Sequence, residues 1–284
     1  MDYYEIFISY KRKSLPTANN LHYRLTTRGY STFFDLEEMR KGNFDVQLLN
    51  YIEKAKDVFI ILEEGSLDAC KSDEWEKDWF CHEIAFALEK KKNIIPILLG
   101  DYKMPSEDFF PDKLKELSLK HAPDFSFSFF DAYLDKLIEK KFITSEAHVQ
   151  NKATSVFKFY SNENCQVFKE GKLVCILEGM LDEPYYLPVH RKGDYRFKVI
   201  NRISADIRTI KERIEADEEK EIDINWQNIK GSCGSLDSRF DILWELGADY
   251  PKLRPEIISM YVKSELSAYS DIDTPIFESR LKKV

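Results

Sequence analysis

The stretch Val58-Phe59-Ile60-Ile61-Leu62 is apolar at every position, and it decides the fold class that we expect. A strand with one face in water alternates apolar and polar residues. A strand without that alternation is typical of a parallel sheet that helices cover on both faces. We therefore expect residues 58–62 to form an inner strand of such a sheet.

Strands and helices are expected to alternate on both sides of this stretch. Ala18, Leu21 and Leu25 recur at helical spacing, and Gly29 follows where a helix end favours glycine. The other segments with strand or helix patterns are strands at residues 4–9, 31–34, 93–99 and 125–127 and helices at residues 45–56, 73–88 and 132–141. This order predicts an α/β fold in which helices wrap a parallel sheet.

The character of the sequence changes near residue 145. Residues 146–152 show little periodicity, and we interpret them as a linker that follows a first domain of residues 1–145. Alternating apolar residues and a turn at Glu170-Gly171 then predict a smaller β-rich accessory domain over residues 153–228. A charged helix is expected within it at about residues 204–216, and residues 229–284 are mainly helical by pattern.

The composition indicates a globular protein with 43% hydrophobic and 32% charged residues. Its longest apolar runs have the length of a strand, far below that of a membrane span. Fifty acidic residues against 42 basic ones give a net charge of −8, which argues against a nucleic-acid partner. The sequence starts with acidic and polar residues rather than a secretory signal, so we expect a cytoplasmic protein without a membrane partner.

Other chemistries find little support in the sequence. Five cysteines without a CxxC motif suggest neither a zinc site nor a disulfide framework. Cys81 and His82 are adjacent, and neighbours on a helix point about 100° apart, which excludes a nucleophile pair. Gly231-Ser232-Cys233-Gly234 lacks the ending of a phosphate-binding loop, and no GxGxxG motif supports redox use of NAD.

Four segments of the first half resemble TIR (Toll/interleukin-1 receptor) domains of the bacterial, NAD-consuming type. In chain order these segments are Phe7-Ile8-Ser9-Tyr10-Lys11-Arg12, residues 29–35 continued by Gly42-Asn43-Phe44, residues 57–62, and Asp78-Trp79-Phe80-Cys81-His82-Glu83-Ile84 followed by the strand at 93–99. The resemblance covers the first 145 residues and implies a flavodoxin-like parallel sheet of five strands. In one departure, Lys13-Ser14 stand where many relatives carry an acidic residue.

The resemblance implies an NAD+ glycohydrolase or ADP-ribose cyclase, which breaks the nicotinamide–ribose bond. The products would be nicotinamide and either ADP-ribose or a cyclic isomer of it. Such a site must stabilise positive charge on the ribose, as in glycoside hydrolysis, and a single carboxylate can do this. Glu83 matches the catalytic glutamate of the family. NAD+ is then the substrate, and we expect neither a separate cofactor nor a metal.

Glu83 lies four residues after Trp79, so both are expected on one helical face. The alternative for Glu83 is an ordinary surface position. Trp79 resembles a family tryptophan near the substrate, with core packing as the alternative.

Four more residues are substrate-binding candidates by resemblance. Asp35 ends the second strand, where it contacts the substrate or forms a turn. Ser9 and Arg12 fall in the first loop, where relatives meet the dinucleotide. Phe7 stacks on the nicotinamide or packs in the core.

The family implies self-association through TIR domains, with movement of the loop after Asp35, and a function in anti-phage or immune signalling. The competing hypothesis is a non-enzymatic adaptor that works through TIR–TIR contacts. Residues 166–174 faintly resemble one hairpin of a PEGA-type module. Tyr185 and Tyr186 are candidates for an exposed surface that binds a regulatory partner or ligand, with packing inside the module as the alternative.

Overall fold

A computed structural model describes residues 4–34, 44–71, 75–121, 123–179, 184–202 and 207–226, with side chains of residues 44–47 excepted. Asp35, the loop that follows it and the segment expected to be helical at 229–284 lie outside these residues. The chain divides into two compact units. The first comprises residues 1–158, 185–192 and 214–220, and the second comprises 159–184, 193–213 and 221–284.

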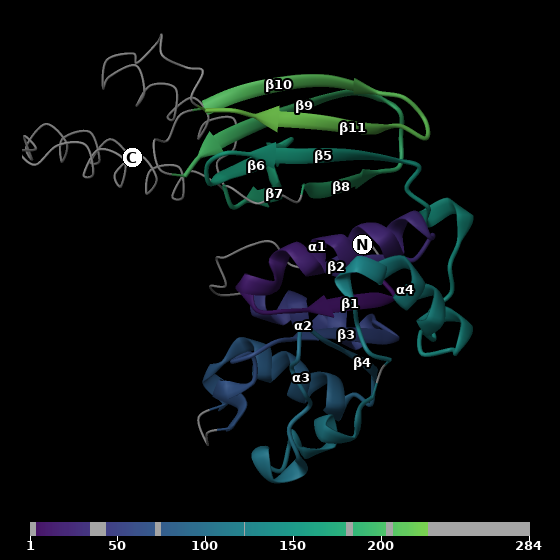
Figure 1. Cartoon of the computed structure of the whole chain (residues 1–284), viewed down its shortest axis with the longest axis vertical. Helices are drawn as coiled ribbons and strands as arrows, with labels where there is room; N and C mark the ends of the chain where they lie inside the picture. The colour runs from purple at the N-terminus through teal and green to yellow at the C-terminus, as the bar shows by residue number, and fades with distance from the viewer. Residues whose placement is uncertain are drawn as a thin grey trace, which may run out of the picture. The chain divides into compact units, whose positions relative to one another are not determined.

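The first unit contains a parallel sheet whose strand order is β2-β1-β3-β4 (Figure 1). Its strands are β1 (Ile6–Ser9), β2 (Thr32–Phe34), β3 (Asp57–Leu62) and β4 (Asn93–Leu98). Phe7 of β1 is in register with Phe33 of β2 and Val58 of β3. All six residues of β3 are buried, which confirms the inner parallel strand expected from its apolar sequence.

In the part of the chain that the structure describes, four helices cover the two faces of this sheet. They are α1 (Leu15–Thr27), α2 (Phe44–Lys54), α3 (Trp79–Glu89) and α4 (Phe130–Glu139). Val58 and Ile60 pack in one core with α2 and α3, whereas Phe59 and Ile61 pack in the other with α1 and α4. Alternate residues of one strand thus bury opposite faces, as the two-residue period of a strand requires.

The prediction of a fifth strand at residues 125–127 is wrong. The parallel sheet has four strands within the described residues, and Phe127 begins a short 3-10 helix, η6 (Phe127–Phe129). The ring of Phe125 packs edge-on against Phe130 and Tyr133 of α4, with centroids 4.9 and 5.2 Å apart. These aromatic residues are therefore used for packing against a helix rather than for strand pairing.

Within the described residues, six further 3-10 helices lie in the connections. They are η1 (Arg12–Ser14), η2 (Asp68–Lys71), η3 (Trp75–Lys77), η4 (Glu107–Phe109), η5 (Lys115–Leu119) and η7 (Val149–Asn151). The helix predicted at residues 73–88 is in fact η3 followed by α3, which begins at Trp79 with Asp78 as its N-cap. No helix in the described part of the chain is long and apolar enough to cross a membrane.

The region after residue 154 is rich in strands, as predicted. Its strands are β5 (Ser155–Ser161), β6 (Cys165–Lys169), β7 (Lys172–Leu177), β8 (Tyr185–Val189), β9 (Gly193–Asn201), β10 (Ile207–Ile214) and β11 (Glu219–Ile224). They form two sheets, of order β10-β9-β6-β7 and β11-β5-β8. The predicted hairpin at Glu170-Gly171 joins β6 to β7, and both turn residues have positive φ, as a two-residue hairpin turn of type I′ requires.

The prediction of a charged helix at residues 204–216 is wrong. Residues 207–214 form strand β10, which pairs with β9 at the edge of its sheet. The charged residues of this segment suit an edge strand, whose outward face meets solvent. The charged and apolar residues of this segment fit both a helical and a strand pattern. Pairing with β9 therefore determined that the segment forms a strand.

The aromatic pair on β8 is less exposed than predicted. Tyr185 is buried, and Tyr186 stacks on Tyr23 of α1 with ring centroids 4.6 Å apart. The buried amide of Asn19 is bonded to the backbone of Tyr186, donating to its carbonyl and accepting from its N–H, each at 2.7 Å. These contacts lie within the first unit and explain why β8 belongs to it.

A buried carboxylate joins the end of the first domain to its sheet. Asp57 begins β3 and is fully buried. It accepts hydrogen bonds from the backbone N–H groups of Thr144 and Ser145 at 3.0 and 2.7 Å and from the Asn93 amide at 2.6 Å. The hydroxyls of Thr144 and Ser145 also donate to it. The carboxylate thus replaces its lost hydration with protein donors.

The segment that we interpreted as a linker is anchored to the end of α1. His148 N–H donates to the carbonyl of Gly29 at 2.9 Å, and Ala153 N–H donates to Thr26 at 3.2 Å. Gly29 has a φ of +94°, and a β-carbon there would lie 2.7 Å from the carbonyl oxygen of His148. Glycine is required at this position both for its backbone conformation and for the close approach of the segment.

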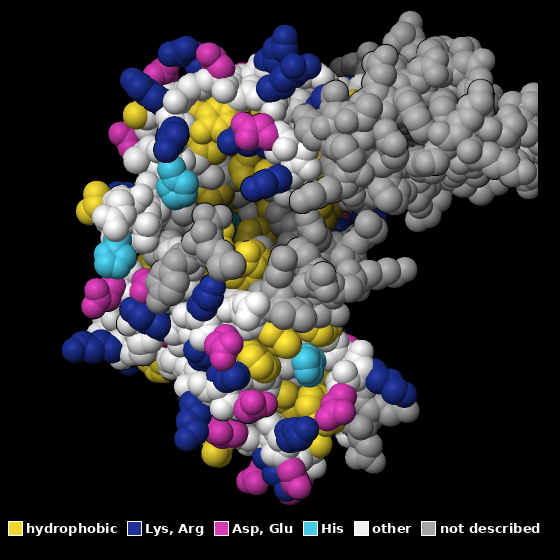
Figure 2. Space-filling view, turned by 180° about the vertical axis from the view of Figure 1, so that it is seen from behind, with side chains coloured by type: hydrophobic (Ala, Val, Ile, Leu, Met, Phe, Trp, Pro, Cys, Tyr) yellow, Lys and Arg dark blue, Asp and Glu magenta, His cyan; other side chains and the backbone are white. Residues whose placement is uncertain are grey.

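Acidic and basic side chains are interspersed over the face of the molecule drawn in Figure 2. Some charged side chains of the first unit pair between helices. Arg28 of α1, for example, lies 2.9 Å from Asp131 and 3.1 Å from Asp135 of α4. Exposed pairs of this kind contribute little to stability, typically below about 1 kcal/mol each.

His22 of α1 is a histidine whose pKa changes on folding. Its Nδ1 lies 2.6 Å from the Thr32 hydroxyl, and its ring packs 4.7 Å from that of Phe34. Burial, with a smaller contribution from His190, lowers the pKa of His22 from 6.5 to about 4. The folded protein thus keeps this imidazole neutral at pH values where the unfolded chain protonates it.

This difference predicts a loss of stability in acid. The stabilisation is fully present above pH 6.5 and is lost as the pH falls towards 4, because the unfolded state binds the proton first. The loss at His22 amounts to about 3 kcal/mol at most. Urea titrations at pH 7 and pH 4.5 should show a smaller decrease in the free energy of unfolding for His22→Asn than for the wild type. If the free energy of unfolding decreases equally in both proteins, the loss of stability in acid does not come from His22.

Candidate functional site

The candidate site lies where the carboxyl end of β1 meets α3. All four residues of β1 are buried, and its last residue, Ser9, is in register with Ile60 of β3. In parallel α/β sheets, the carboxyl ends of the strands carry the loops that bind ligands. The loop after β1 supplies Lys11 and Arg12, and the first two turns of α3 supply Trp79 and Glu83.

Glu83 is a buried carboxylate held by a hydroxyl. Its side chain is 3% exposed, and the Oγ of Ser9 donates a hydrogen bond to its Oε2 at 2.5 Å. Removing a carboxylate from water is unfavourable unless hydrogen bonds replace its hydration. The alternative of an ordinary exposed helix position therefore does not describe Glu83, which is fixed in place at the end of β1.

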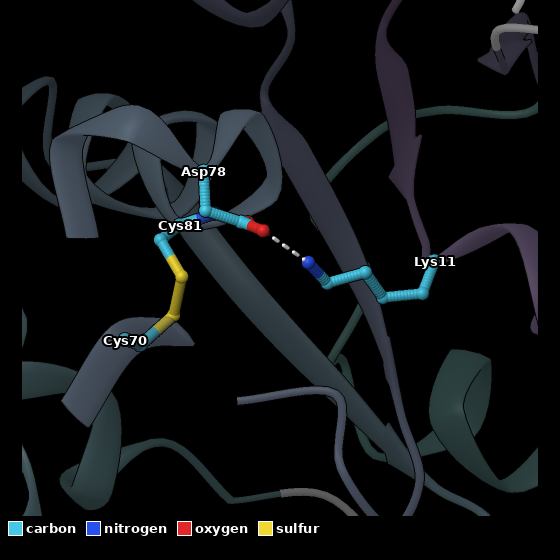
Figure 3. Close-up of a disulfide and its surroundings, with 4 residues drawn as sticks. All are labelled: Lys11, Cys70, Asp78 and Cys81. Carbon is cyan, nitrogen blue, oxygen red and sulfur yellow. Dashed lines mark hydrogen bonds and ion pairs between the residues drawn. A yellow bond between two sulfur atoms is a disulfide. The ribbon is translucent and has the colours of Figure 1, made fainter. Parts of the chain in front are cut away.

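The N-terminus of α3 is tied to the loop after β1. Asp78 caps the helix by accepting from the backbone N–H of Cys81 at 3.1 Å. Its other oxygen lies 2.6 Å from the Lys11 ammonium (Figure 3). The same ammonium lies 5.2 Å from the centre of the Phe80 ring. Sequence reasoning missed this pair, although an aspartate just before a helical apolar pattern is an N-cap signal.

The cysteine pattern suggested no disulfide framework, yet Cys70 of η2 is bonded to Cys81 of α3 (Figure 3). Both residues are fully buried, and their Cα atoms are 5.6 Å apart. The two cysteines are separated by 11 positions and lie in different elements. Spacing alone therefore gave no sign of the bond. Cys165 and Cys175, in contrast, are buried and free.

The loop after β1 is further anchored to the loop after β3. Ser14 donates to the Glu63 carboxylate, and Lys13 lies 3.7 Å from another oxygen of Glu63 and donates to the Glu64 carbonyl. Lys13 and Ser14 are the positions at which the sequence departs from the family pattern. At this point of the fold the acidic group is the Glu63 carboxylate, which comes from the loop after β3.

The remaining predicted residues occupy varied positions. Phe7 is buried and stacks on Phe33 with centroids 5.7 Å apart, so the structure shows it packing in the core. Trp79 is half-buried, packs against the same core and lies 5.1 Å from the His82 ring. Arg12 begins η1 and is partly buried. Asp35 lies outside the described residues, and the substrate contacts of all four residues stay predictions.

A groove of about 640 Å³ runs along another side of α3. Its lining includes Trp75, His82, Phe86 and Lys113 but not Glu83. This groove therefore does not coincide with the held carboxylate, and the chemistry of Glu83 identifies the candidate site.

Comparisons with known proteins identify the family of the first part of the chain. Residues 6–138 match the family model described as TIR domain. The chain is 33% identical over 153 residues to "NAD(+) hydrolase sarm1" of Drosophila melanogaster, an alignment that covers 54% of this chain and 11% of that protein. It is 30% identical over 164 residues to "NAD(+) hydrolase tir-1" of Caenorhabditis elegans, covering 57% of this chain and 16% of that protein. The chain thus spans a small part of the length of these curated relatives.

Among solved structures, the TIR domain of the Toll-related receptor TRR-2 from Hydra magnipapillata is similar in fold. It is 19% identical, covers 48% of this chain and 97% of its own, and superposes with a TM-score of 0.33.

Proposed function

Because residues 6–138 are a TIR domain, we propose that this protein cleaves the bond between nicotinamide and ribose in NAD+, with Glu83 as its catalytic carboxylate. The observation that carries the proposal is the hydrogen bond from Ser9 to the buried Glu83. The names of the relatives aligned with this part of the chain, both NAD(+) hydrolases, support the same substrate.

The reaction needs little from the protein except control of charge. Nicotinamide leaves NAD+ as a neutral molecule, so no proton has to be donated to it. Positive charge then develops on the ribose, and a fixed carboxylate stabilises it in a site with little water. Water adds to the ribose carbon that carried the nicotinamide and releases a proton, giving ADP-ribose. If a nitrogen of the adenine attacks instead, the product is a cyclic isomer.

The proposed role in the cell follows from this chemistry. Consumption of NAD+ or production of a signal nucleotide suits immune or anti-phage signalling in the cytoplasm, activated by self-association of TIR domains. The β-rich region would then bind the regulatory partner or ligand that controls assembly. These parts of the proposal rest on the family resemblance described above.

The test is incubation of the concentrated full-length protein with NAD+, with separation of the products by chromatography. Release of nicotinamide is the expected result, and the nucleotide formed with it distinguishes hydrolysis from cyclisation. If neither the dilute nor the assembled protein releases nicotinamide, the enzymatic proposal fails and the adaptor hypothesis takes its place.

Ser9→Ala separates positioning from substrate binding. Loss of a hydrogen bond to a charged group costs about 1.5–3 kcal/mol, so kcat for nicotinamide release is expected to fall about 10- to 100-fold. KM should change little if Ser9 acts through Glu83. Ser9→Thr keeps the hydroxyl and should restore much of the rate. An increase in KM at unchanged kcat would instead place Ser9 in contact with the substrate.

A further inference from the structure

The first turn of α3 is held from two directions (Figure 3). On one side the Lys11 ammonium pairs with Asp78, the N-cap of the helix. On the other side the sulfur of Cys81 is bonded to Cys70. The two attachments come from different loops, one after β1 and the other after β3. Together they attach the first turn of α3 to both of these loops.

The two attachments differ in strength and in sensitivity to the solvent. The side chains of Lys11 and Asp78 are 27% and 25% exposed, so water and salt weaken their attraction. Both cysteines are fully buried and their link is covalent. The disulfide is therefore the stronger constraint on this turn.

Glu83 follows Cys81 by two positions in the same helix. Two residues of an α-helix rise by about 3 Å, so a movement of Cys81 is transmitted to Glu83 through the hydrogen-bonded backbone. The hydroxyl of Ser9, in contrast, belongs to a buried strand of the sheet. A shift of α3 would consequently change the position of Glu83 relative to Ser9.

We propose that the Cys70–Cys81 disulfide is a redox-dependent positioning element for Glu83. The inference rests on the function proposed above. A dithiol reductant attacks one sulfur, the S–S bond breaks, and the dithiol becomes a disulfide. Two electrons and two protons pass to Cys70 and Cys81, which become thiols. In the reduced protein the first turn of α3 keeps its ion pair to Lys11 but loses its covalent attachment, and Glu83 is held less firmly.

The expected effect is on turnover rather than on binding. Misplacement of a catalytic group by about 1 Å can cost about 100-fold in rate, and a partly released helix should cost about tenfold in kcat. KM should change little, since the residues proposed to contact NAD+ are unaltered. A role confined to global stability would change neither constant while the protein remains folded.

The experiment compares oxidised full-length protein with protein treated with dithiothreitol without denaturant. Alkylation and mass spectrometry count the new thiols and locate them. Nicotinamide release gives kcat and KM, and hydrogen exchange measures the protection of the amides of residues 79–84. The double variant Cys70→Ala/Cys81→Ala should show the low rate and the low protection in both conditions.

Cys165→Ala/Cys175→Ala is the matched control. These cysteines are also buried, and burial raises the pKa of the Cys165 thiol to about 11, which keeps it protonated and unreactive. This variant should respond to dithiothreitol as the wild type does. Cys233 remains in both double variants, so its contribution is the same in each.

Each outcome decides the proposal. A tenfold lower kcat on reduction, with weaker protection of α3 and no response in the Cys70→Ala/Cys81→Ala variant, supports it. An unchanged kcat after complete reduction overturns it, and so does a disulfide that resists the dithiol in the folded protein. If no form releases nicotinamide, the proposed function fails separately, and hydrogen exchange alone shows whether the disulfide positions α3.

Discussion

Replacing Glu83 with glutamine is expected to lower the rate of nicotinamide release from NAD+ by about 10³-fold. Glutamine has nearly the same shape and keeps an oxygen that can accept the hydrogen bond from Ser9. It lacks the negative charge that stabilises the developing cation on the ribose. Initial rates of nicotinamide release by both proteins at equal concentration measure the difference, and thermal unfolding shows whether the variant is folded.

Glu89→Gln is the matched control for this experiment. Glu89 lies at the end of the same helix and is exposed, so its loss should leave the rate unchanged. A Glu83→Gln protein that keeps more than a tenth of the wild-type rate would show that another carboxylate acts in the reaction.

Replacing Asp57 with alanine should have the largest effect on stability. The change removes a fully buried carboxylate that accepts from the backbone and hydroxyls of Thr144 and Ser145 and from Asn93. Ser145 is buried, so its N–H and its hydroxyl would both lose this acceptor away from water. Since each unsatisfied buried group costs about 1–3 kcal/mol, the free energy of unfolding should fall by about 4 kcal/mol. Urea denaturation followed by tryptophan fluorescence measures the change.

Asp131→Ala serves as the comparison for Asp57→Ala. Asp131 is 58% exposed and pairs with Arg28 at the surface, so its removal should cost less than about 1 kcal/mol. If the two variants lose similar stability, the donors around Asp57 are satisfied in another way, and the anchoring of Thr144 and Ser145 is weaker than the structure implies.

The fold of the first unit was predictable because its signals are local. The apolar run of β3 and the helical spacing of Ala18, Leu21 and Leu25 each depend on short stretches of sequence. The charged stretch of β10 was predicted wrongly as a helix because its pairing with β9 cannot be seen within the stretch itself. Strand formation depends on neighbours more than helix formation does.

The candidate site was predictable only in part, because its contacts join residues that are distant in the sequence. Glu83 and Ser9 were identified through separate motifs, but their hydrogen bond joins positions 74 residues apart. The disulfide and the Lys11–Asp78 pair likewise join residues from different elements. A sequence names the chemical groups of a site, whereas the distances between them follow from the packing of the sheet and its helices.

The anchoring of residues 148–153 to the end of α1 determines how the first domain should be isolated. A protein that ends at residue 145 would lose the N–H groups of His148 and Ala153, which donate to Gly29 and Thr26. Its rate would then report damage to α1 as well as the loss of the β-rich region. A protein that ends after residue 153 retains both hydrogen bonds but still loses the contacts of Tyr186 with Asn19 and Tyr23 of α1. Its comparison with the whole chain therefore needs a measurement of the stability of α1 beside the rate.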